Sequence, residues 1–268
     1  MQFINFVYLD AGIPVTVPCQ AVNKVCASGM KAIVFGAQSI MLGDNDIVVA
    51  GGMESMSNAP YYLQRGETPY GGVNLTDGLV LDGLTNPFDN THMGLCTEGL
   101  AAKWQITRQQ QDEFAKMSYT RSAKAAQDGL LAAEIVPVVI PGTRGKPDVT
   151  IDQDEEYKKV NFDKFPTLNT VFKRENGTIT AANASTLNDG AAACVLVSGR
   201  AIKQLGIKPL ARIVGYADAG VEPVDFGIAP AHAIPKVIKN SIGNKTSLFL
   251  IIIQTVEYIH FTLFYQLK

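Results

Sequence analysis

The sequence has few cysteines, few histidines and almost no net charge, and each shortage excludes a class of protein. Its 268 residues hold 23 Lys and Arg against 25 Asp and Glu, a net charge of -2, so no basic surface for nucleic acid is expected. The four cysteines show no CxxC spacing and no disulfide framework, which suits a reducing compartment. The histidines His92, His232 and His260 are not clustered as metal ligands are.

Neither end of the sequence carries a clear targeting signal. The amino-terminal residues MQFINFVYLD lack the basic start and cleavage site of a signal peptide, and they lack the arginines of a transit peptide. The run 247–268 is apolar and aromatic, but Gln254, Glu257 and His260 interrupt it. A spanning helix needs about 20 predominantly apolar residues, and a charge at bilayer depth is expensive. We therefore do not expect this tail to span a membrane.

The most informative stretch runs from Val17 to Gly52. Its pattern predicts a strand up to Val25, a sharp turn, an apolar helix that ends at Gly43, and a short strand over 47–50. The helix is apolar nearly all round, so we expect it to be buried. Cys26 lies at the turn before it.

Two interpretations of Cys26 remain open at this point. The first N–H groups of a helix are unpaired and carry partial positive charge, so a thiolate there is stabilised and its pKa falls from about 8.5 towards neutrality. The small residues Ala27, Ser28 and Gly29 would let an acyl group approach the backbone. The alternative is a buried cysteine that only fills space, which is common.

The rest of the chain is predicted to alternate loops, helices and strands. Residues 53–96 have no strong period and predict an ordered loop region that contacts something. Thr107 and Gln110 form a capping box for a helix that stops at Gly129. On this helix Tyr119 is most simply a half-buried tyrosine. Further predicted elements are a strand over 135–140, an exposed segment over 142–174, a strand over 210–220 and an amphipathic helix over 230–242.

A small polar run over 181–189 precedes a continuous apolar strand that opens at Gly190. The strand is typical of one buried on both faces of a sheet, with Cys194 in the core. The run before it, which includes Asn183 and Ser185, either lets a ligand approach the backbone or forms a plain Asx-type turn. Both interpretations stay open.

Several long motifs occur in a fixed order between about Asp10 and about Asn240. They are NKVCASGMKA, VVAGGMESMSNAPYYL, HMG, ENGTITAANASTLNDGAAA, LARIVGYADA and PVDFGIAP. Together they resemble the thiolases, in particular the acetyl-CoA acetyltransferases of mitochondria. The resemblance implies a partial α/β thiolase fold, with a mixed sheet, buried helices, an inserted loop domain and a second half that is largely missing. The implied divisions are part of the amino-terminal core (1–56), the loop domain (57–179), the remainder of that core (180–208), the start of the carboxyl-terminal domain (209–246) and a divergent apolar tail (247–268).

The resemblance also implies roles for individual residues. Cys26 matches the nucleophile, which accepts an acyl group from acyl-CoA and passes it to a second acyl-CoA, or to CoA in the reverse direction. Coenzyme A would be a substrate and no prosthetic group is implied. The implied CoA-binding residues are His92, Met93, Tyr119, Lys159, Asn161, Lys164 and Ser185. A potassium ion would take oxygen ligands from Tyr119, Ala181, Ala182 and Ala184.

Some features depart from the family pattern. Lys159 and Asn161 differ in type from the residues expected there. The family motifs Asn-Glu-Ala-Phe, Gly-His-Pro and Cys-x-Gly do not occur after Asn240, and neither His232 nor His260 replaces them. These motifs supply a base, an oxyanion donor and a second cysteine. Loss of one general base costs about 10²–10⁴-fold, so impaired or absent condensation is expected.

Other functions remain as alternatives. One is a non-catalytic partial subunit that pairs with full-length thiolase, or that its tail tethers to a membrane. Another is a cysteine hydrolase, which is disfavoured because no Cys/His pairing is evident. The resemblance implies acetyl-CoA, acetoacetyl-CoA and CoA as ligands, a homo-oligomer, and a mitochondrial role in lipid and ketone body metabolism. Without a visible transit peptide, a cytoplasmic location stays open.

Overall fold

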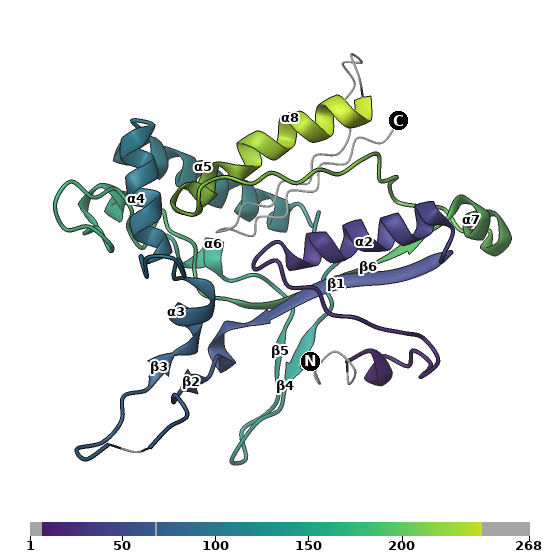
Figure 1. Ribbon diagram of the computed structural model, residues 1–268, viewed down its shortest axis with the longest axis horizontal. Coiled ribbons are helices and arrows are strands. Elements are labelled where there is room, and N and C mark those ends of the chain that lie inside the picture. Colours follow the sequence, from purple (N-terminus) through teal and green to yellow (C-terminus); the bar gives the residue numbers. More distant parts are fainter. Residues whose placement is uncertain (1–6, 68, 243–268) are drawn as a thin grey trace. The chain divides into compact units, whose positions relative to one another are not determined.

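The computed structural model describes residues 7–67 and 69–242 (Figure 1). Within these residues the chain forms two compact units, one drawn from the described residues on either side of 94–186 and the other from Gly94–Thr186. Helices and small antiparallel sheets alternate along the chain, so the α/β class expected from the sequence is confirmed. The predicted tail over 247–268 lies outside the described residues.

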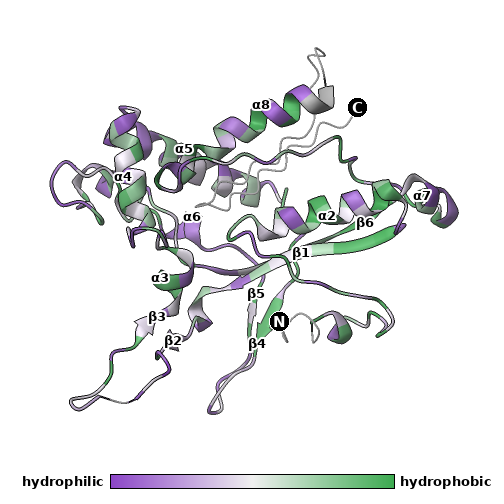
Figure 2. Ribbon diagram, in the orientation of Figure 1, coloured by the Kyte–Doolittle hydropathy of each residue, from purple (hydrophilic) through white to green (hydrophobic). Residues whose placement is uncertain are grey.

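The first unit is centred on a pair of long strands covered by one helix. Strand β1 (Ile47–Ser55) pairs antiparallel with β6 (Asp189–Val197) along its whole length. Helix α2 (Ser28–Leu42) packs on this pair, and Figure 2 shows hydrophobic residues along both strands. The packing depends on Gly36, because a Cβ added there would lie 2.8 Å from a methyl group of Leu196.

Helix α2 begins and ends close to where the sequence predicts. Gly43 ends it with φ of 83°, a conformation that glycine adopts without strain. The expected burial on all sides is wrong, because only Gly36 and Ala37 are buried and Met41 is 75% exposed. By length and composition alone Val25–Leu42 could cross a membrane, but the core helix of a soluble protein passes the same test.

Four strand predictions are wrong in detail. Residues 17–23 form no strand, and residues 210–220 are irregular, since neither segment pairs with a neighbour among the described residues. Strand β1 extends beyond the predicted range 47–50, because β6 pairs with it as far as Ser55. Strand β6 is not buried on both faces: Val195 is 61% exposed, and Cys194 is only half-buried.

The remaining elements of the first unit are short apart from one helix. Strands β2 (Tyr61–Tyr62) and β3 (Thr76–Asp77) form a small hairpin, followed by α3 (Gly78–Gly83). A 3-10 turn, η1, covers Met56–Asn58. After β6 come α7 (Gly199–Leu205), η3 (Pro223–Ile228) and α8 (Ala229–Ile242), the last close to the predicted amphipathic helix.

The second unit is built on two helices. Helix α4 (Met93–Lys103) starts just before Gly94, where the second unit begins in the sequence. Helix α5 (Arg108–Gln127) begins with the predicted capping box of Thr107 and Gln110. A hairpin of β4 (Val138–Ile140) and β5 (Val149–Ile151) follows, with β4 covering the end of the strand expected over 135–140. Helix α6 (Glu156–Lys159) and the 3-10 turn η2 (Phe162–Thr167) then pack against α5.

Candidate active site

Cys26 lies in a tight turn that local hydrogen bonds fix. Val25, just before it, has φ of 48°, in the left-handed region that a β-branched residue rarely adopts. Such a conformation costs about 1–3 kcal/mol and persists only where neighbouring contacts hold it. Here Asn23 Oδ1 accepts the Val25 N–H at 2.9 Å. Ser28 Oγ accepts the Lys24 N–H at 2.8 Å and donates to the Val25 carbonyl at 2.6 Å.

The turn leads directly into α2, so Cys26 stands just before the amino-terminal end of that helix. Ala27 is the helix cap, and the N–H of Ser28, the first residue of the helix, donates to the Val25 carbonyl at 3.1 Å. The positive end of the helix dipole therefore lies at the turn. The thiol of Cys26 is half-buried there, at the helix start that the sequence predicts.

Two glycines bring the start of α2 close to the middle of β1. A Cβ added to Gly52 would lie 3.1 Å from the Gly29 Cα, and one added to Gly29 would lie 3.5 Å from the Gly52 Cα. The two backbones approach closely because neither residue has a side chain. The turn that carries Cys26 is thus set against a rigid strand.

A contact distant in sequence also reaches this turn. The carboxylate of Asp218, in the irregular segment before η3, binds the ammonium groups of Lys24 and Lys31. The two lysines lower the pKa of Asp218, with Lys24 the larger cause, so the carboxylate is ionised at neutral pH. No sequence pattern indicates this contact, since Asp218 is 194 residues from Lys24.

The HMG motif follows a closed loop in the first unit. His92 forms a bridge to Thr85, and the Met93 N–H donates to the Leu84 carbonyl at 2.8 Å. Asn86 within this loop is only 2% exposed. Burial lowers the pKa of His92 below its usual value, so the ring is neutral at neutral pH.

In the second unit the buried carboxylate of Glu98 binds the backbone just before the small polar run over 181–189. Glu98 of α4 is 4% exposed, and its carboxylate accepts the N–H groups of Thr178 and Ile179, each at 2.9 Å. The Thr178 hydroxyl donates to the same carboxylate at 2.9 Å. Sequence reasoning missed Glu98, because nothing in LCTEGLAA distinguishes it from a surface acid.

The polar run itself forms a turn held by Asn183. Its Oδ1 accepts the N–H of the fully buried Thr180 at 2.8 Å, and its Nδ2 donates to Asp112 of α5 at 2.9 Å. Asp112 also binds Arg108 at 2.8 Å. Three of the four predicted ion-binding residues, Ala181, Ala182 and Ala184, lie in this turn, which continues to the exposed Ser185. The fourth, Tyr119, is on α5.

Tyr119 of α5 belongs to an aromatic cluster. Its ring centroid lies 6.5 Å from that of Phe162 and 6.4 Å from that of Phe165, both in η2. Burial, followed by the charge of Glu156, raises the pKa of Tyr119, so its hydroxyl keeps its proton at neutral pH. The half-buried position agrees with the simplest interpretation of the sequence.

The predicted CoA-binding cations lie beside this cluster. Lys159 ends α6, is exposed, and forms an ion pair with Glu155 at 2.8 Å. Asn161 caps η2 by accepting the Asp163 N–H at 3.1 Å, and the exposed Lys164 lies within η2. Of the predicted site, Cys26, His92 and Met93 fall in the first unit and the other residues in the second. No group of three His, Cys, Asp or Glu side chains suited to a metal ion occurs in the part of the chain that the structure describes.

Comparison with known families decides which fold this is. Residues 2–200 match the family described as thiolase, N-terminal domain. The chain belongs to the thiolase family. The family resemblance expected from the sequence motifs is therefore confirmed, and so is the thiolase fold.

Individual thiolases extend the comparison. The mitochondrial acetyl-CoA acetyltransferase of Bos taurus is 59% identical over 233 residues, which cover 87% of this chain and 55% of the bovine protein. The Homo sapiens enzyme is 56% identical over 232 residues, covering 87% and 54%. This thiolase chain thus spans about half the length of the curated relatives it matches.

Solved structures of thiolases are also similar to this chain. The structure of Acat5 thiolase from Ascaris suum in complex with coenzyme A has a TM-score of 0.84 at 45% identity, covering 91% of this chain and 62% of that one. An acetyl-CoA acetyltransferase from Syntrophomonas wolfei has a TM-score of 0.82 at 39% identity, covering 88% and 59%.

Proposed function

We propose that this thiolase chain performs acyl transfer from acetyl-CoA, with Cys26 as the residue that accepts the acyl group. The observation that carries the proposal is the fixed turn that holds Cys26 just before the start of α2. A partly positive helix end stabilises both a thiolate and a developing oxyanion.

The proposed step is a thioester exchange. The Sγ of Cys26 attacks the carbonyl carbon of the acyl group, and an oxyanion forms on the carbonyl oxygen. The bond from that carbon to the CoA sulfur then breaks. The acyl group remains on Cys26 as a thioester, and the thiol proton is transferred, in net, to the departing CoA sulfur.

Most of the side chains proposed to bind coenzyme A belong to the second unit. Lys159 and Lys164 are exposed cations suited to phosphate groups, and Ser185 is exposed at the end of the small polar turn. We propose the same role for Tyr119 and Asn161 beside them, and for His92 and Met93 of the HMG motif. Support comes from the related Ascaris suum thiolase, whose structure is described as a complex with coenzyme A.

A potassium ion is proposed at the turn that Asn183 holds. Backbone carbonyls of Ala181, Ala182 and Ala184, with Tyr119, would provide oxygen ligands of the kind that hard cations prefer. The proposal is supported by the tight Thr180–Ala184 turn, in which the Ala184 N–H donates to the Thr180 carbonyl at 2.9 Å.

Carbon–carbon bond formation is proposed to be impaired, because residues 1–268 contain no Asn-Glu-Ala-Phe, Gly-His-Pro or Cys-x-Gly motif. The curated relatives are named mitochondrial acetyl-CoA acetyltransferases, so a role in mitochondrial acetyl-CoA and acetoacetyl-CoA metabolism is proposed for this chain. A second candidate, a partial subunit that pairs with a full-length thiolase, is favoured by the exposed apolar side chains of β1 and β6, of which Val49 is 55% and Val195 61% exposed. Co-purification with a full-length thiolase would support that candidate.

The test is to incubate the full chain with acetyl-CoA and locate the acetyl group by peptide mass spectrometry. We expect one acetyl group on Cys26, none in Cys26→Ala, and unchanged labelling in the matched control Cys19→Ala. Acetylation at another cysteine, or none in the wild type, would overturn the proposal. An acetoacetyl-CoA thiolysis assay on the same samples tests the impaired second step separately.

A further inference from the structure

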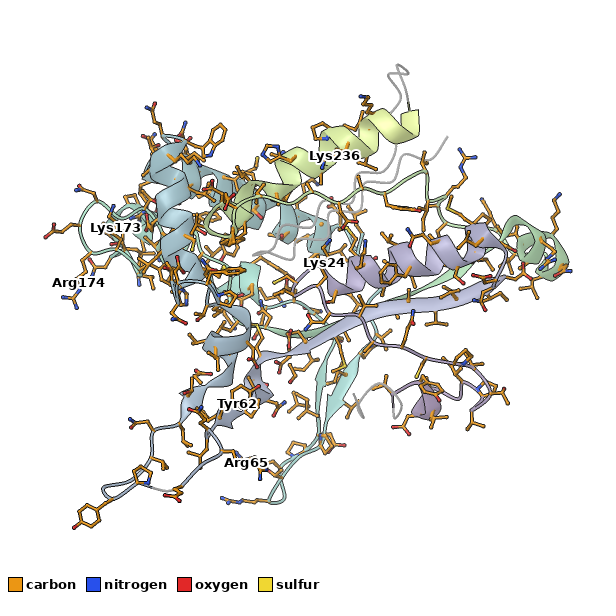
Figure 3. All side chains as sticks on the ribbon, viewed as in Figure 1. Lys24, Tyr62, Arg65, Lys173, Arg174 and Lys236 are labelled. Atoms are coloured by element: carbon orange, nitrogen blue, oxygen red, sulfur yellow. The ribbon has the colours of Figure 1, made fainter. Side chains whose placement is uncertain are left out.

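Asp218 contacts the turn that carries Cys26, helix α2 and helix α8, all in the first unit. Its Oδ2 lies 2.7 Å from the Lys31 Nζ, and its Oδ1 binds the Nζ of Lys24. Lys24 precedes Cys26 in the turn, and Lys31 follows it in α2. The backbone carbonyl of Asp218 also accepts from Lys236 of α8 at 3.3 Å. Figure 3 labels Lys24 and Lys236 on these elements.

The lysines that Asp218 binds lie on opposite sides of a strained residue. Lys24 immediately precedes Val25 in the chain. The contacts of this turn must keep Val25 at its positive φ. Asn23 and Ser28 act from within the turn, whereas Asp218 acts from a distant segment. A carboxylate that holds both lysines restricts how far the turn can move relative to the first turn of α2.

We propose that Asp218 is a positioning residue for Cys26, which it keeps at the start of α2 by holding Lys24 and Lys31 together. The inference rests on the proposed function in taking Cys26 as the reactive residue. Asp218 touches neither the thiol nor the acyl group in this role. It acts through the two lysines and the backbone of the turn.

Because the ion pairs of Asp218 are largely exposed, their effect on Cys26 can be measured apart from any effect on the stability of the fold. The side chains of Lys24 and Asp218 are 46% and 51% exposed, and only that of Lys31 is more covered, at 19%. Exposed ion pairs contribute little to the free energy of unfolding. Removing the Asp218 carboxylate should therefore change the reactivity of Cys26 while it leaves the fold intact.

The cysteines of the chain provide the measurement and its internal references. The full chain is treated briefly with iodoacetamide, and alkylation of each cysteine is quantified by peptide mass spectrometry. Cys19 is exposed and serves as the reference for reagent and exposure time. Cys96 is 6% exposed and becomes labelled only if the protein unfolds. The variants are Asp218→Asn, Asp218→Glu and a matched control, Asp128→Asn, which removes an exposed carboxylate 2.6 Å from Lys124 on α5.

We expect the ratio of Cys26 to Cys19 alkylation to fall by about five- to tenfold in Asp218→Asn, because a relaxed turn no longer holds the thiolate at the helix end. Asp218→Glu should restore the ratio to within about twofold of the wild type, since it keeps the carboxylate. Asp128→Asn should not change it, and Cys96 should stay unlabelled throughout.

An unchanged or increased ratio in Asp218→Asn overturns the proposal, as does a loss that Asp218→Glu fails to restore. Labelling of Cys96 in Asp218→Asn also overturns it, because the carboxylate would then support the fold as a whole. The measurement does not involve acetyl-CoA. If the wild type alkylates as expected but accepts no acetyl group, the proposed acyl transfer fails while the positioning role of Asp218 stands.

Discussion

Ser57 and Asp189 form two hydrogen bonds that join the carboxyl-terminal end of β1 to the start of β6. The backbone N–H of Ser57 donates to Asp189 Oδ1 at 2.9 Å, and its hydroxyl donates to Oδ2 of the same carboxylate. Asp189 is opposite Ser55 in the strand register, so the contact closes the pair where β1 ends. The chain leaves β1 and returns to β6 at this point.

The first prediction concerns the pH dependence of this contact. The Ser57 hydroxyl, followed by the Ser57 N–H, lowers the pKa of Asp189 in the folded state. A lowered folded pKa contributes stability above the unfolded value of about 3.9 and loses it as the pH falls through the folded value. Asp189→Asn should therefore lower the melting temperature at neutral pH and have a smaller effect below about pH 4. The control Asp44→Asn, at an exposed position after α2, should change the melting temperature equally at both pH values. Thermal unfolding at neutral pH and below about pH 4 measures these changes.

The second prediction concerns the buried acid of α4. Glu98→Ala leaves the N–H groups of Thr178 and Ile179 without their acceptor, and should lower the free energy of unfolding by at least about 2 kcal/mol. Glu98→Gln keeps one acceptor oxygen and should lose less. The exposed Glu113→Ala on α5 is the control and should change little. Urea unfolding gives all three values, and equal stability of Glu98→Ala and the wild type would contradict the assigned role.

The third prediction tests the turn proposed to bind potassium. Potassium chloride should raise the melting temperature of the wild type above the value in lithium chloride at equal ionic strength, because a ligand that binds only the folded state stabilises it. Asn183→Ala removes the acceptor for the Thr180 N–H and the donor to Asp112, so the difference should disappear. Asn176→Ala, at an exposed loop position in the same unit, should retain it. A wild type that does not distinguish the two salts would refute the ion site.

The fourth prediction ranks three glycines of the strand pair. A Cβ at Gly51 would lie 2.5 Å from the Ala192 carbonyl oxygen, one at Gly52 3.1 Å from the Gly29 Cα, and one at Gly190 would meet nothing within 4 Å. Gly51→Ala should therefore cost about 1–3 kcal/mol, Gly52→Ala less, and Gly190→Ala close to nothing. Chemical denaturation of the three variants checks the order. A Gly190→Ala variant as unstable as Gly51→Ala would contradict crowding as the cause, because replacing an uncrowded glycine by alanine lowers the entropy of the unfolded chain and should not destabilise the fold.

The sequence predicted best what is decided locally. The capping box of Thr107 and Gln110, the end of α2 at Gly43 and the helix predicted over 230–242 depend on residues a few positions apart, and the structure has all three, the last as α8. The position of Cys26 at a helix start follows from the same kind of signal. Collinear motifs then identified the family.

What the sequence could not predict depends on partners distant in the chain. A strand needs a neighbour, so the apolar segment 210–220 was predicted as a strand that the structure does not form. The exposure of Val195 depends on which elements cover β6. The roles of Asp218 and Glu98 come from contacts with residues far along the sequence, and side-chain type alone does not reveal them.

The pairing of β1 with β6 has a consequence for the order in which the chain acquires structure. The two strands are adjacent in the sheet, but the entire second unit is synthesised between them. Contacts between distant segments form slowly, because a long stretch of chain must first be brought together. On the ribosome, residues 94–186 are complete before β6 emerges. Helix α2 and β1, with the turn that carries Cys26, must therefore wait for a partner strand that is made only after the second unit has had time to fold.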